Sequence, residues 1–475
     1  MHDFVIKGGQ VAIGDNLVES DIGIGHGFIR ELGTDLSGRE TIDATGLWVM
    51  PGGIDSHCHL DQPDWGSAQS ADDFRSGSVS AAFGGITCMF PFAMPGPGMS
   101  TLDAFDRATG RAAGRSVIDY GLHGVVTGAS ASDLGSQFDR LVCEGVVSVK
   151  VFMTFGELFV GDDLFLDVLE AARARGMIVM VHAENDAAIR RTAQRLAESG
   201  RTGLRYHAVA HSEIMEREAT HRAIALAEVT GGRIAVLHVS CIQAAEELVR
   251  GRVRGVDVVG ETCPQYLFLT AADLNGDPTN AARFVFSPPP RTKASQEHLW
   301  AAMESGEIQL WSSDHSPYRL ADKLPDPANP SFERAVSGIP GLETQMPLLF
   351  SEGLRTGRIT LPRYLDLTAR NAARWYGVDH VKGRIECGLH ADLCLWDPDR
   401  KWTLAQSALR SNVDYTPYEG HVVTGKPVTV LVRGLPIIRD GVLTEAHGHG
   451  VYVARKTAAP SGFNRPVQDS TPWLD

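Results

Sequence analysis

Two histidines separated by one residue, His57 and His59, are the first residues along the chain whose types and spacing suit metal binding. Residues 47–50 are apolar and lead to them through a Pro-Gly-Gly break. In a β-strand, residues two apart point to the same side, so both imidazoles can face one ion. A His-x-His pair alone is weak evidence, because most histidines are solvated or hydrogen-bonded in a core. The metal interpretation therefore depends on further ligands elsewhere in the chain.

Four more candidate ligands stand in or at the end of other apolar runs. Lys150 lies within residues 146–152 and His182 closes residues 177–182. His238 lies at the end of residues 234–239, and Asp314 closes residues 308–314. Taken singly, each favours an ordinary role such as a hydrogen-bonded core histidine or a helix-capping aspartate. Six metal-competent groups at the ends of five apolar runs instead predict a single site.

The elements that must position these groups are eight apolar runs separated by helical segments. The runs are residues 47–54, 85–92, 117–126, 146–152, 177–182, 234–239, 256–263 and 308–314. One intervening helix has apolar residues at an i, i+3, i+4, i+7 spacing from Phe165 and ends before Gly176. Eight buried strands alternating with helices predict an α/β fold, a parallel (β/α)8 TIM-type barrel. Such barrels gather their chemistry at the C-terminal ends of the strands.

Both ends of the chain have a different pattern from the middle. Short strands with glycine and Asn/Asp turns are expected at residues 4–9, 10–13, 21–24 and 28–32. Strand-and-turn character returns at residues 383–386, 391–398 and 427–434. We therefore expect a small composite β-sandwich domain from residues 1–50 plus 380–456, a metal-dependent barrel over residues 51–379, and an extended C-terminal arm at residues 457–475.

Composition excludes several classes of function. The chain has 475 residues and a formal net charge of −14, which argues against a general binder of nucleic acid or of an anionic membrane. No apolar run approaches the roughly 18 residues of a membrane span, and no signal peptide is evident at the N-terminus. The seven cysteines are scattered and odd in number, which predicts reduced core residues in a cytoplasmic protein.

Lys150 needs its own chemistry in a metal site. A protonated amine would repel cations, but burial lowers the pKa of a lysine, and a neutral amine can capture carbon dioxide as a carbamate. A carbamate offers two anionic oxygens that can bridge two metal ions. Two divalent cations, one carbamate, one aspartate and one hydroxide leave a single positive charge. Four neutral imidazoles complete a nitrogen and oxygen ligand set that suits zinc or a similar first-row metal.

The ordered set Asp55-x-His57-x-His59, Lys150, His182, His238 and Asp314 resembles the cyclic amidohydrolases of the amidohydrolase superfamily. Further stretches resemble the hydantoinase and dihydropyrimidinase branch in particular: residues 59–61, 118–123, 150–153, 180–184, 238–241, 260–266, 286–291 and 313–317. The resemblance spans roughly residues 4–450 and implies a barrel with a composite β-sandwich, assembled as a homotetramer or homodimer.

Carried over by position, the resemblance assigns a role to each candidate. The more buried metal is held by His57, His59, carbamylated Lys150 and Asp314, and the second by Lys150, His182 and His238. A hydroxide bridging the metals attacks the ring carbonyl of a hydantoin or dihydropyrimidine. Asp314 takes the proton of the hydroxide and passes it to the leaving nitrogen. Main-chain groups near Ser287 and Ser337 hold the imide or ureide edge of the substrate.

Two departures from the family pattern, and one residue that agrees with it, bear on the substrate. The family's usual tyrosine, five residues after the lysine, is Phe155 here, which cannot donate a hydrogen bond to a developing oxyanion. The usual Asn-Gly of a late barrel loop is Ser337-Gly338. Asp61 stands where similar dihydroorotases carry an arginine, which argues against dihydroorotate. A cyclic imide, an allantoin-like ureide or a cyclic enamide therefore stays open as an alternative substrate.

Three further interpretations are less favoured by the sequence. A catalytically inactive structural relative would be expected to have lost ligands, whereas all six positions here hold competent residues. His447-Gly-His449 repeats the His-x-His pattern without a partner motif, and His123 is expected to be a buried, hydrogen-bonded histidine.

Overall fold

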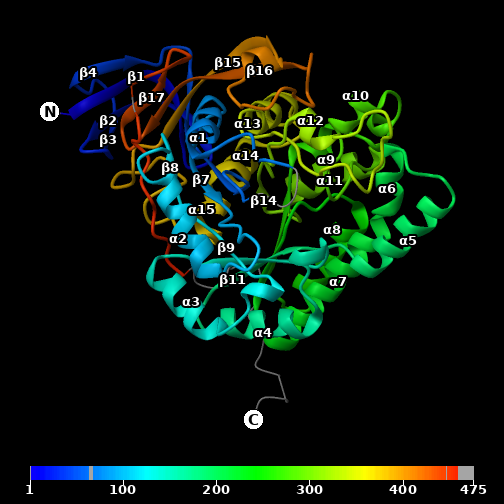
Figure 1. The fold of residues 1–475 in the computed structure, drawn as a ribbon. Coiled ribbons are helices and arrows are strands. Elements are labelled where there is room, and N and C mark those ends of the chain that lie inside the picture. Colours follow the sequence, from blue (N-terminus) through cyan, green and yellow to red (C-terminus); the bar gives the residue numbers. More distant parts are fainter. Residues whose placement is uncertain (1, 64–67, 446, 458–475) are drawn as a thin grey trace.

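The computed structural model describes residues 2–63, 68–445 and 447–457. Its first layer is a nine-stranded sheet in the order β18-β17-β16-β15-β5-β1-β2-β3, with β4 paired to β1. Figure 1 shows the N-terminal strands, in blue, beside the C-terminal strands, in orange and red. These strands are β1 (His2–Ile13), β2 (Asn16–Gly25), β3 (Phe28–Gly33), β4 (Gly38–Asp43), β5 (Trp48–Pro51), β15 (Leu393–Thr403), β16 (Val422–Val432), β17 (Leu435–Arg439) and β18 (Val442–Leu443).

The second part is a parallel barrel, as the alternation of apolar runs and helices predicts. Its strands are β6 (Gly53–Cys58), β7 (Ile86–Pro91), β8 (Asp119–Tyr120), β9 (Gly124–Val125), β10 (Ser148–Phe152), β11 (Ile178–His182), β12 (Arg233–Val236), β13 (Val258–Thr262) and β14 (Leu310–Trp311). They form a six-stranded and a three-stranded parallel sheet. Parallel bridges Phe92–His123 and Cys58–His315 join the two sheets, which closes the barrel.

Helices form the outer layer of the barrel and follow its strands in sequence (Figure 1). They are α1 (Phe74–Phe83), α2 (Thr101–Ala112), α3 (Leu134–Cys143), α4 (Asp162–Arg173), α5 (Asp186–Glu198), α6 (His207–Ala210), α7 (Glu213–Thr230), α8 (Ile242–Val253), α9 (Pro264–Phe268), α10 (Pro278–Ala282), α11 (Lys293–Ser305), α12 (Leu320–Lys323), α13 (Gln345–Leu349), α14 (Leu361–Leu365) and α15 (Asn371–Trp375). The apolar face of α4 is buried, and Gly176 follows this helix at φ 65°.

The structure corrects five of the expected strands. Residues 47–54 divide at Gly52 between β5 of the large sheet and β6 of the barrel, where an added Cβ would lie 2.2 Å from the Thr87 side chain. Residues 117–126 hold two short strands, β8 and β9. The two strands expected at residues 4–13 are one, β1, with an irregular register between Ile6 and Gly9. Residues 383–386 are not a strand but bends and irregular backbone, and β15 begins only at Leu393.

The chain returns from the large sheet to the barrel near its C-terminus. Tyr452 forms a parallel bridge with Tyr120, and the main-chain N–H of Arg455 donates to the Gly145 carbonyl at 2.9 Å. The division into a β-sandwich of residues 1–50 plus 380–456 and a barrel of residues 51–379 stays a prediction. The arm expected at residues 457–475 lies almost wholly outside the described residues.

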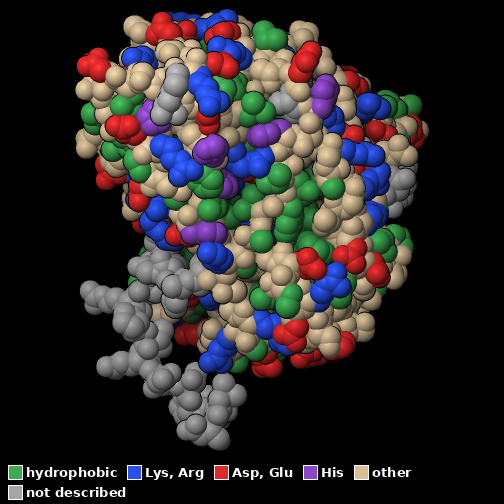
Figure 2. Space-filling model, turned by 90° about the vertical axis from the view of Figure 1, so that its left-hand side faces the viewer, with side chains coloured by type: hydrophobic (Ala, Val, Ile, Leu, Met, Phe, Trp, Pro, Cys, Tyr) green, Lys and Arg blue, Asp and Glu red, His purple; other side chains and the backbone are tan. Residues whose placement is uncertain are grey.

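Three further features of the fold are its helix hydrophobicity, its cysteines and its surface charges. Within the described ranges, no helix combines the length and the apolar character that crossing a membrane requires. All seven cysteines are free, and five are buried as expected, but Cys143 and Cys387 are exposed. Figure 2 shows acidic and basic side chains interspersed over one face, with apolar side chains grouped near its centre.

Candidate metal centre

The six candidate ligands converge at the C-terminal end of the barrel strands. His57 lies in β6 with His59 just beyond it, Lys150 lies in β10 and His182 ends β11. His238 follows β12 by two residues, and Asp314 follows β14 by three. A parallel barrel brings these strand ends to one place, because successive strands start and finish together. Five of the six line a single cavity, and His57, which is not part of its wall, lies 2.9 Å from Asp314.

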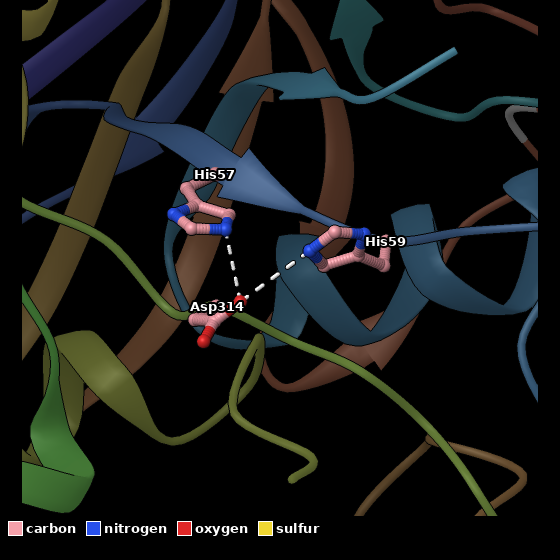
Figure 3. A group of neighbouring side chains, drawn as sticks. All are labelled: His57, His59 and Asp314. Carbon is pink, nitrogen blue, oxygen red and sulfur yellow. Dashed lines mark ion pairs between the residues drawn. The ribbon is translucent and has the colours of Figure 1, made fainter. Parts of the chain in front are cut away.

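The first part of the cluster joins the His-x-His pair to Asp314 (Figure 3). Oδ1 of Asp314 lies 2.9 Å from Nε2 of His57 and 3.4 Å from Nε2 of His59. Nζ of Lys150 lies 3.4 Å from the same nitrogen of His57. Three potential ligand atoms and a lysine amine thus surround one point in a buried setting.

The second part is formed by His182 and His238. Nδ1 of His182 lies 2.9 Å from Nε2 of His238, while Nε2 of His182 faces a carboxylate oxygen of Glu184 at 2.7 Å. If Glu184 holds the ring hydrogen of His182, Nδ1 presents a lone pair toward His238. Two nitrogens in this arrangement are well placed to share a cation, so the residues present fit a metal ion.

Carboxylates and main-chain bonds fix the ligand side chains in place. Oε1 of Glu261 lies 2.6 Å from Nδ1 of His57, which leaves Nε2 of that ring for a metal. His238 and Asp314 have left-handed backbone conformations, with φ of 39° and 47°, that cost of order 1 kcal/mol each. The Asp314 N–H donates to the His57 carbonyl at 3.0 Å, which holds one of these strained residues.

Lys150 has the environment that the carbamate interpretation requires. Burial lowers the pKa of its amine to about 8, although Asp314 and Glu261 act in the opposite direction. Nζ lies 4.3 Å from the ring centroid of Phe92 and 4.5 Å from that of Phe152. Aromatic walls exclude water, so the amine is neutral far more often than an exposed lysine. The geometry thus suits capture of carbon dioxide beside the His57 ligand.

Electrostatics keep Asp314 ionised. Burial raises the pKa of this carboxyl, but His57 and His59 outweigh it and hold the pKa well below the usual range. The pKa of His59 is lowered to about 3, chiefly by burial, so this ring is neutral. Burial lowers the pKa of His57, but Asp314 and Glu261 outweigh it and raise this pKa. A cation bound at His57 would have to displace a proton, whereas Asp314 and His59 already have the protonation states of metal ligands.

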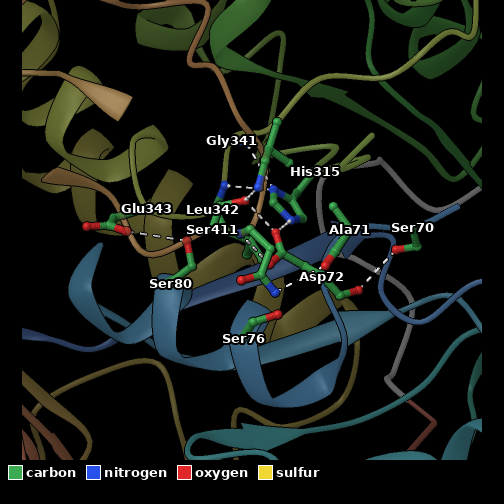
Figure 4. A network of polar contacts seen from close by, with 12 residues as sticks. Ser70, Ala71, Asp72, Ser76, Ser80, His315, Gly341, Leu342, Glu343 and Ser411 are labelled. Carbon is green, nitrogen blue, oxygen red and sulfur yellow. Dashed lines mark hydrogen bonds and ion pairs between the residues drawn. The ribbon is translucent and has the colours of Figure 1, made fainter. Parts of the chain in front are cut away.

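The loop that carries Asp314 is anchored by a polar network around His315 (Figure 4). Nε2 of His315 lies 3.2 Å from Asp72, and Nδ1 accepts from the Gly341 N–H at 3.1 Å. Asp72 also accepts from the main chain of Asn412 at 2.9 Å. This network connects the end of β14 to three distant segments and thereby fixes the position of Asp314.

The cavity in front of the ligands has a volume of about 870 Å³. Phe155 forms part of its wall and lies edge-on to His182, with ring centroids 4.7 Å apart. Ser287 and Ser337 also line it, and their hydroxyl oxygens are 3.1 Å apart. All three residues that the resemblance assigns to substrate contacts therefore face the same space as the candidate ligands.

The remaining motifs lie elsewhere. Asp61 pairs with Arg111 at 2.9 Å and is not among the residues of the cavity wall. His123 is buried and hydrogen-bonded to Ser148 and to the Ser56 carbonyl, as expected. Nε2 of His449 donates to the Val432 carbonyl at 3.0 Å.

Several functional side chains were missed in the sequence. Glu184 and Glu261 fall within the motif stretches 180–184 and 260–266, but those stretches do not identify them as partners of ligand histidines. Gln62 and Tyr318, which also line the cavity, lie just outside the motif stretches 59–61 and 313–317. The acidic residue two positions after His182 was an available signal, because metal-bound histidines commonly pair with carboxylates. The positions of Glu261, Gln62 and Tyr318 beside the site are visible only in the three-dimensional fold.

A closed (β/α)8 barrel with histidines, a lysine and an aspartate at its strand ends defines a class of metal-dependent barrel enzymes. Comparison with known proteins agrees. The model of the amidohydrolase family matches residues 48–437. The chain therefore belongs to the amidohydrolase family, in its hydantoinase and dihydropyrimidinase branch.

Individual relatives match nearly the whole chain. The D-hydantoinase of Geobacillus stearothermophilus is 39% identical over 95% of this chain and 96% of its own length. The crystal structure of dihydropyrimidinase from Brevibacillus agri is 36% identical, with a TM-score of 0.91 over 97% of this chain and 99% of its own. The L-hydantoinase (dihydropyrimidinase) from Arthrobacter aurescens is 30% identical, with a TM-score of 0.87 over 96% and 100%. The similarity thus extends to relatives named for both D- and L-hydantoin chemistry.

Proposed function

We propose that this protein hydrolyses the ring amide of a small cyclic amide of the hydantoin or dihydropyrimidine type. The observation that carries the proposal is the convergence of His57, His59, Lys150, His182, His238 and Asp314 around one cavity. Relatives named D-hydantoinase and dihydropyrimidinase match over nearly their full length, which supports the same reaction class here.

The ligand set is best suited to two divalent ions, and we propose zinc. His57, His59, Lys150 and Asp314 would hold one ion, and Lys150, His182 and His238 the other. When bound, such ions activate water as a nucleophile and polarise the ring carbonyl. Lys150, as a carbamate, would contribute to both ions at once, and its lowered pKa of about 8 supports this modification.

The remaining steps belong to side chains of this chain. Asp314 is anionic, faces the cavity and would accept the proton of the attacking water, then return it to the leaving ring nitrogen. The loops of Ser287 and Ser337 would hold the imide or ureide edge of the ring. Their hydroxyls bond to each other, which leaves main-chain groups as the substrate contacts.

The test is a panel of 5-substituted hydantoins, dihydrouracil, succinimide and allantoin, offered to protein loaded with zinc. We expect ring opening of a hydantoin or of dihydrouracil by the wild type, and its loss in Asp314→Asn. Asp61→Asn is the matched control, since Asp61 is not part of the cavity wall. Fully loaded protein that opens no member of the panel would refute the proposal.

Phe155 favours a second candidate substrate class within the same chemistry. A phenylalanine beside His182 makes this wall of the cavity apolar where the family tyrosine would place a hydroxyl. A cyclic imide, allantoin-like ureide or cyclic enamide is the alternative, and the same panel separates these outcomes. Assembly as a homotetramer or homodimer and a cytoplasmic location stay predictions from the sequence.

A further inference from the structure

Hydrolysis of a ring amide places negative charge on the carbonyl oxygen, and a donor aimed at that oxygen speeds the reaction by about 10²–10³. The tyrosine that the family usually carries would be such a donor, but this chain has Phe155 at that position. The cavity must therefore supply the hydrogen bond from another residue, or the metal ions must act without one. The side chains that line the cavity show where such a donor stands.

Tyr318 is the only tyrosine among the described residues of the cavity wall. It follows the ligand Asp314 by four residues in the loop after β14. Its ring packs against Gly338, since an added Cβ there would lie 2.7 Å from Cδ2 of Tyr318. The ring thus stands between the metal ligands and the Ser337-Gly338 loop, and these are the two places that the proposed substrate touches.

Gln62 connects the Tyr318 hydroxyl to a metal ligand. The hydroxyl lies 3.3 Å from one end of the Gln62 amide, and the other end contacts Nδ1 of His59. His59 presents Nε2 to Asp314, so metal binding through Nε2 requires the ring hydrogen on Nδ1. The amide must then turn its oxygen toward His59, because only the oxygen accepts a hydrogen bond.

This half-turn of the amide changes the role of the phenol. The NH2 group of Gln62 now faces Tyr318 and donates to its oxygen. The phenolic hydrogen, no longer directed at Gln62, is free to point into the cavity. Metal binding at His59 therefore prepares Tyr318 as a donor through a single intervening side chain.

We propose that Tyr318 donates a hydrogen bond to the ring-carbonyl oxygen as negative charge develops on it, in the role that Phe155 cannot fill. The inference rests on the proposed function. No proton is transferred in this step, because the phenol keeps its hydrogen throughout. Burial, followed by the charge of Asp314, raises the pKa of Tyr318 to about 12, so the phenol stays protonated at neutral pH.

The other hydroxyls of the cavity are less suited to this role. Thr154 donates to Asp186 at 3.3 Å, and the hydroxyls of Ser287 and Ser337 bond to each other. Ser316 also lines the cavity and is the remaining rival. Its side chain is short and lies beside Gly338, where an added Cβ would be 2.9 Å from Cβ of Ser316. It has no link to the ligand His59 comparable to that of Tyr318 through Gln62.

The experiment compares Tyr318→Phe, Ser316→Ala and the double variant Tyr318→Phe with Phe155→Tyr, all loaded with zinc. We expect Tyr318→Phe to lower kcat about 100-fold with KM within about threefold of wild type. Ser316→Ala should keep wild-type turnover. Phe155→Tyr should recover at least tenfold of the lost turnover, because it returns a phenol to the same cavity.

Zinc titration of the metal-free proteins separates the hydroxyl from the orientation of His59. Tyr318→Phe should bind zinc as the wild type does, whereas Gln62→Leu should weaken zinc binding about tenfold. Turnover of Tyr318→Phe within threefold of wild type would overturn the inference. So would a larger loss in Ser316→Ala, no recovery in the double variant, or a loss of zinc affinity in Tyr318→Phe. Wild-type protein inactive on the whole panel would instead refute the proposed function.

Discussion

If Lys150 binds the metal ions as the proposed carbamate, metal uptake by this protein should require carbon dioxide. In the experiment, metal-free protein is prepared in buffer without carbon dioxide and then given zinc with or without bicarbonate. Without bicarbonate, we expect His57, His59 and Asp314 to hold zinc weakly and the protein to stay inactive. With bicarbonate, we expect two zinc ions per chain and full activity.

The pH dependence follows from the lowered pKa of the amine. An ordinary lysine with a pKa of 10.5 is neutral for about 0.03% of the time at pH 7. A pKa of about 8 raises this to roughly 10%, a gain of about 300-fold. The neutral form is lost as pH falls below 8, so activation at fixed dissolved carbon dioxide should slow about tenfold from pH 7 to pH 6. Above pH 8 it should level off.

Bound zinc, recovered activity and native mass are measured in the same samples. Lys150→Ala should fail to respond to bicarbonate, and a mass gain of one carbon dioxide should be absent from it. Lys323→Met is the matched control, because Lys323 is also buried with a lowered pKa but faces the Val285 and Gly338 carbonyls. Full zinc uptake without carbon dioxide, or full turnover by Lys150→Ala, would refute the proposal that Lys150 binds the metal ions as a carbamate.

Three further substitutions test the surroundings of the ligands. Glu261→Gln should weaken zinc binding 10–100-fold, measured by competition with a chelator, since the carboxylate holds the His57 ring at 2.6 Å; unchanged affinity would contradict this. Lys323→Met should raise KM by up to about 30-fold and leave zinc content unchanged, because it loses two bonds to the substrate loops, each worth about 1 kcal/mol. An unaltered KM would count against this. Phe155→Tyr alone should raise turnover of hydantoins about two- to fivefold, and a loss of activity would show that the cavity has diverged from hydantoin chemistry.

The barrel and the six candidate ligands could be predicted because their signals are local. Each ligand stands in or just after an apolar run, and the alternation of runs with helices identifies the parallel barrel that gathers them. Local signals were wrong where one apolar run serves two sheets. The apolar pattern of residues 47–54 predicts one strand. In the structure, Gly52 packs closely against Thr87, and the residues divide there between β5 of the large sheet and β6 of the barrel.

The partners of the ligands could not be predicted because they are distant in sequence. Glu261 is 204 residues from His57, and Tyr318 is 256 residues from Gln62. In sequence, Glu261 is an ordinary polar residue of a strand and Gln62 an ordinary loop amide. Only the closed barrel shows that each stands directly behind a ligand histidine.

These partners change the charge balance of the centre. Counting ligands alone, two divalent ions, a carbamate, an aspartate and a hydroxide leave one positive charge. Glu184 and Glu261 lie 2.7 and 2.6 Å from ligand histidines, and counting both carboxylates turns the balance to one negative charge. His59 contacts the neutral amide of Gln62 instead. The added negative charge therefore comes from the carboxylates beside His57 and His182. A buried carboxylate beside a ligand histidine attracts a divalent cation, and this attraction is stronger in the low-dielectric interior than in water. Neutralising Glu261 should therefore weaken metal binding through charge as well as through the position of His57, and Glu261→Asp, which keeps the charge but shortens the reach, separates the two effects.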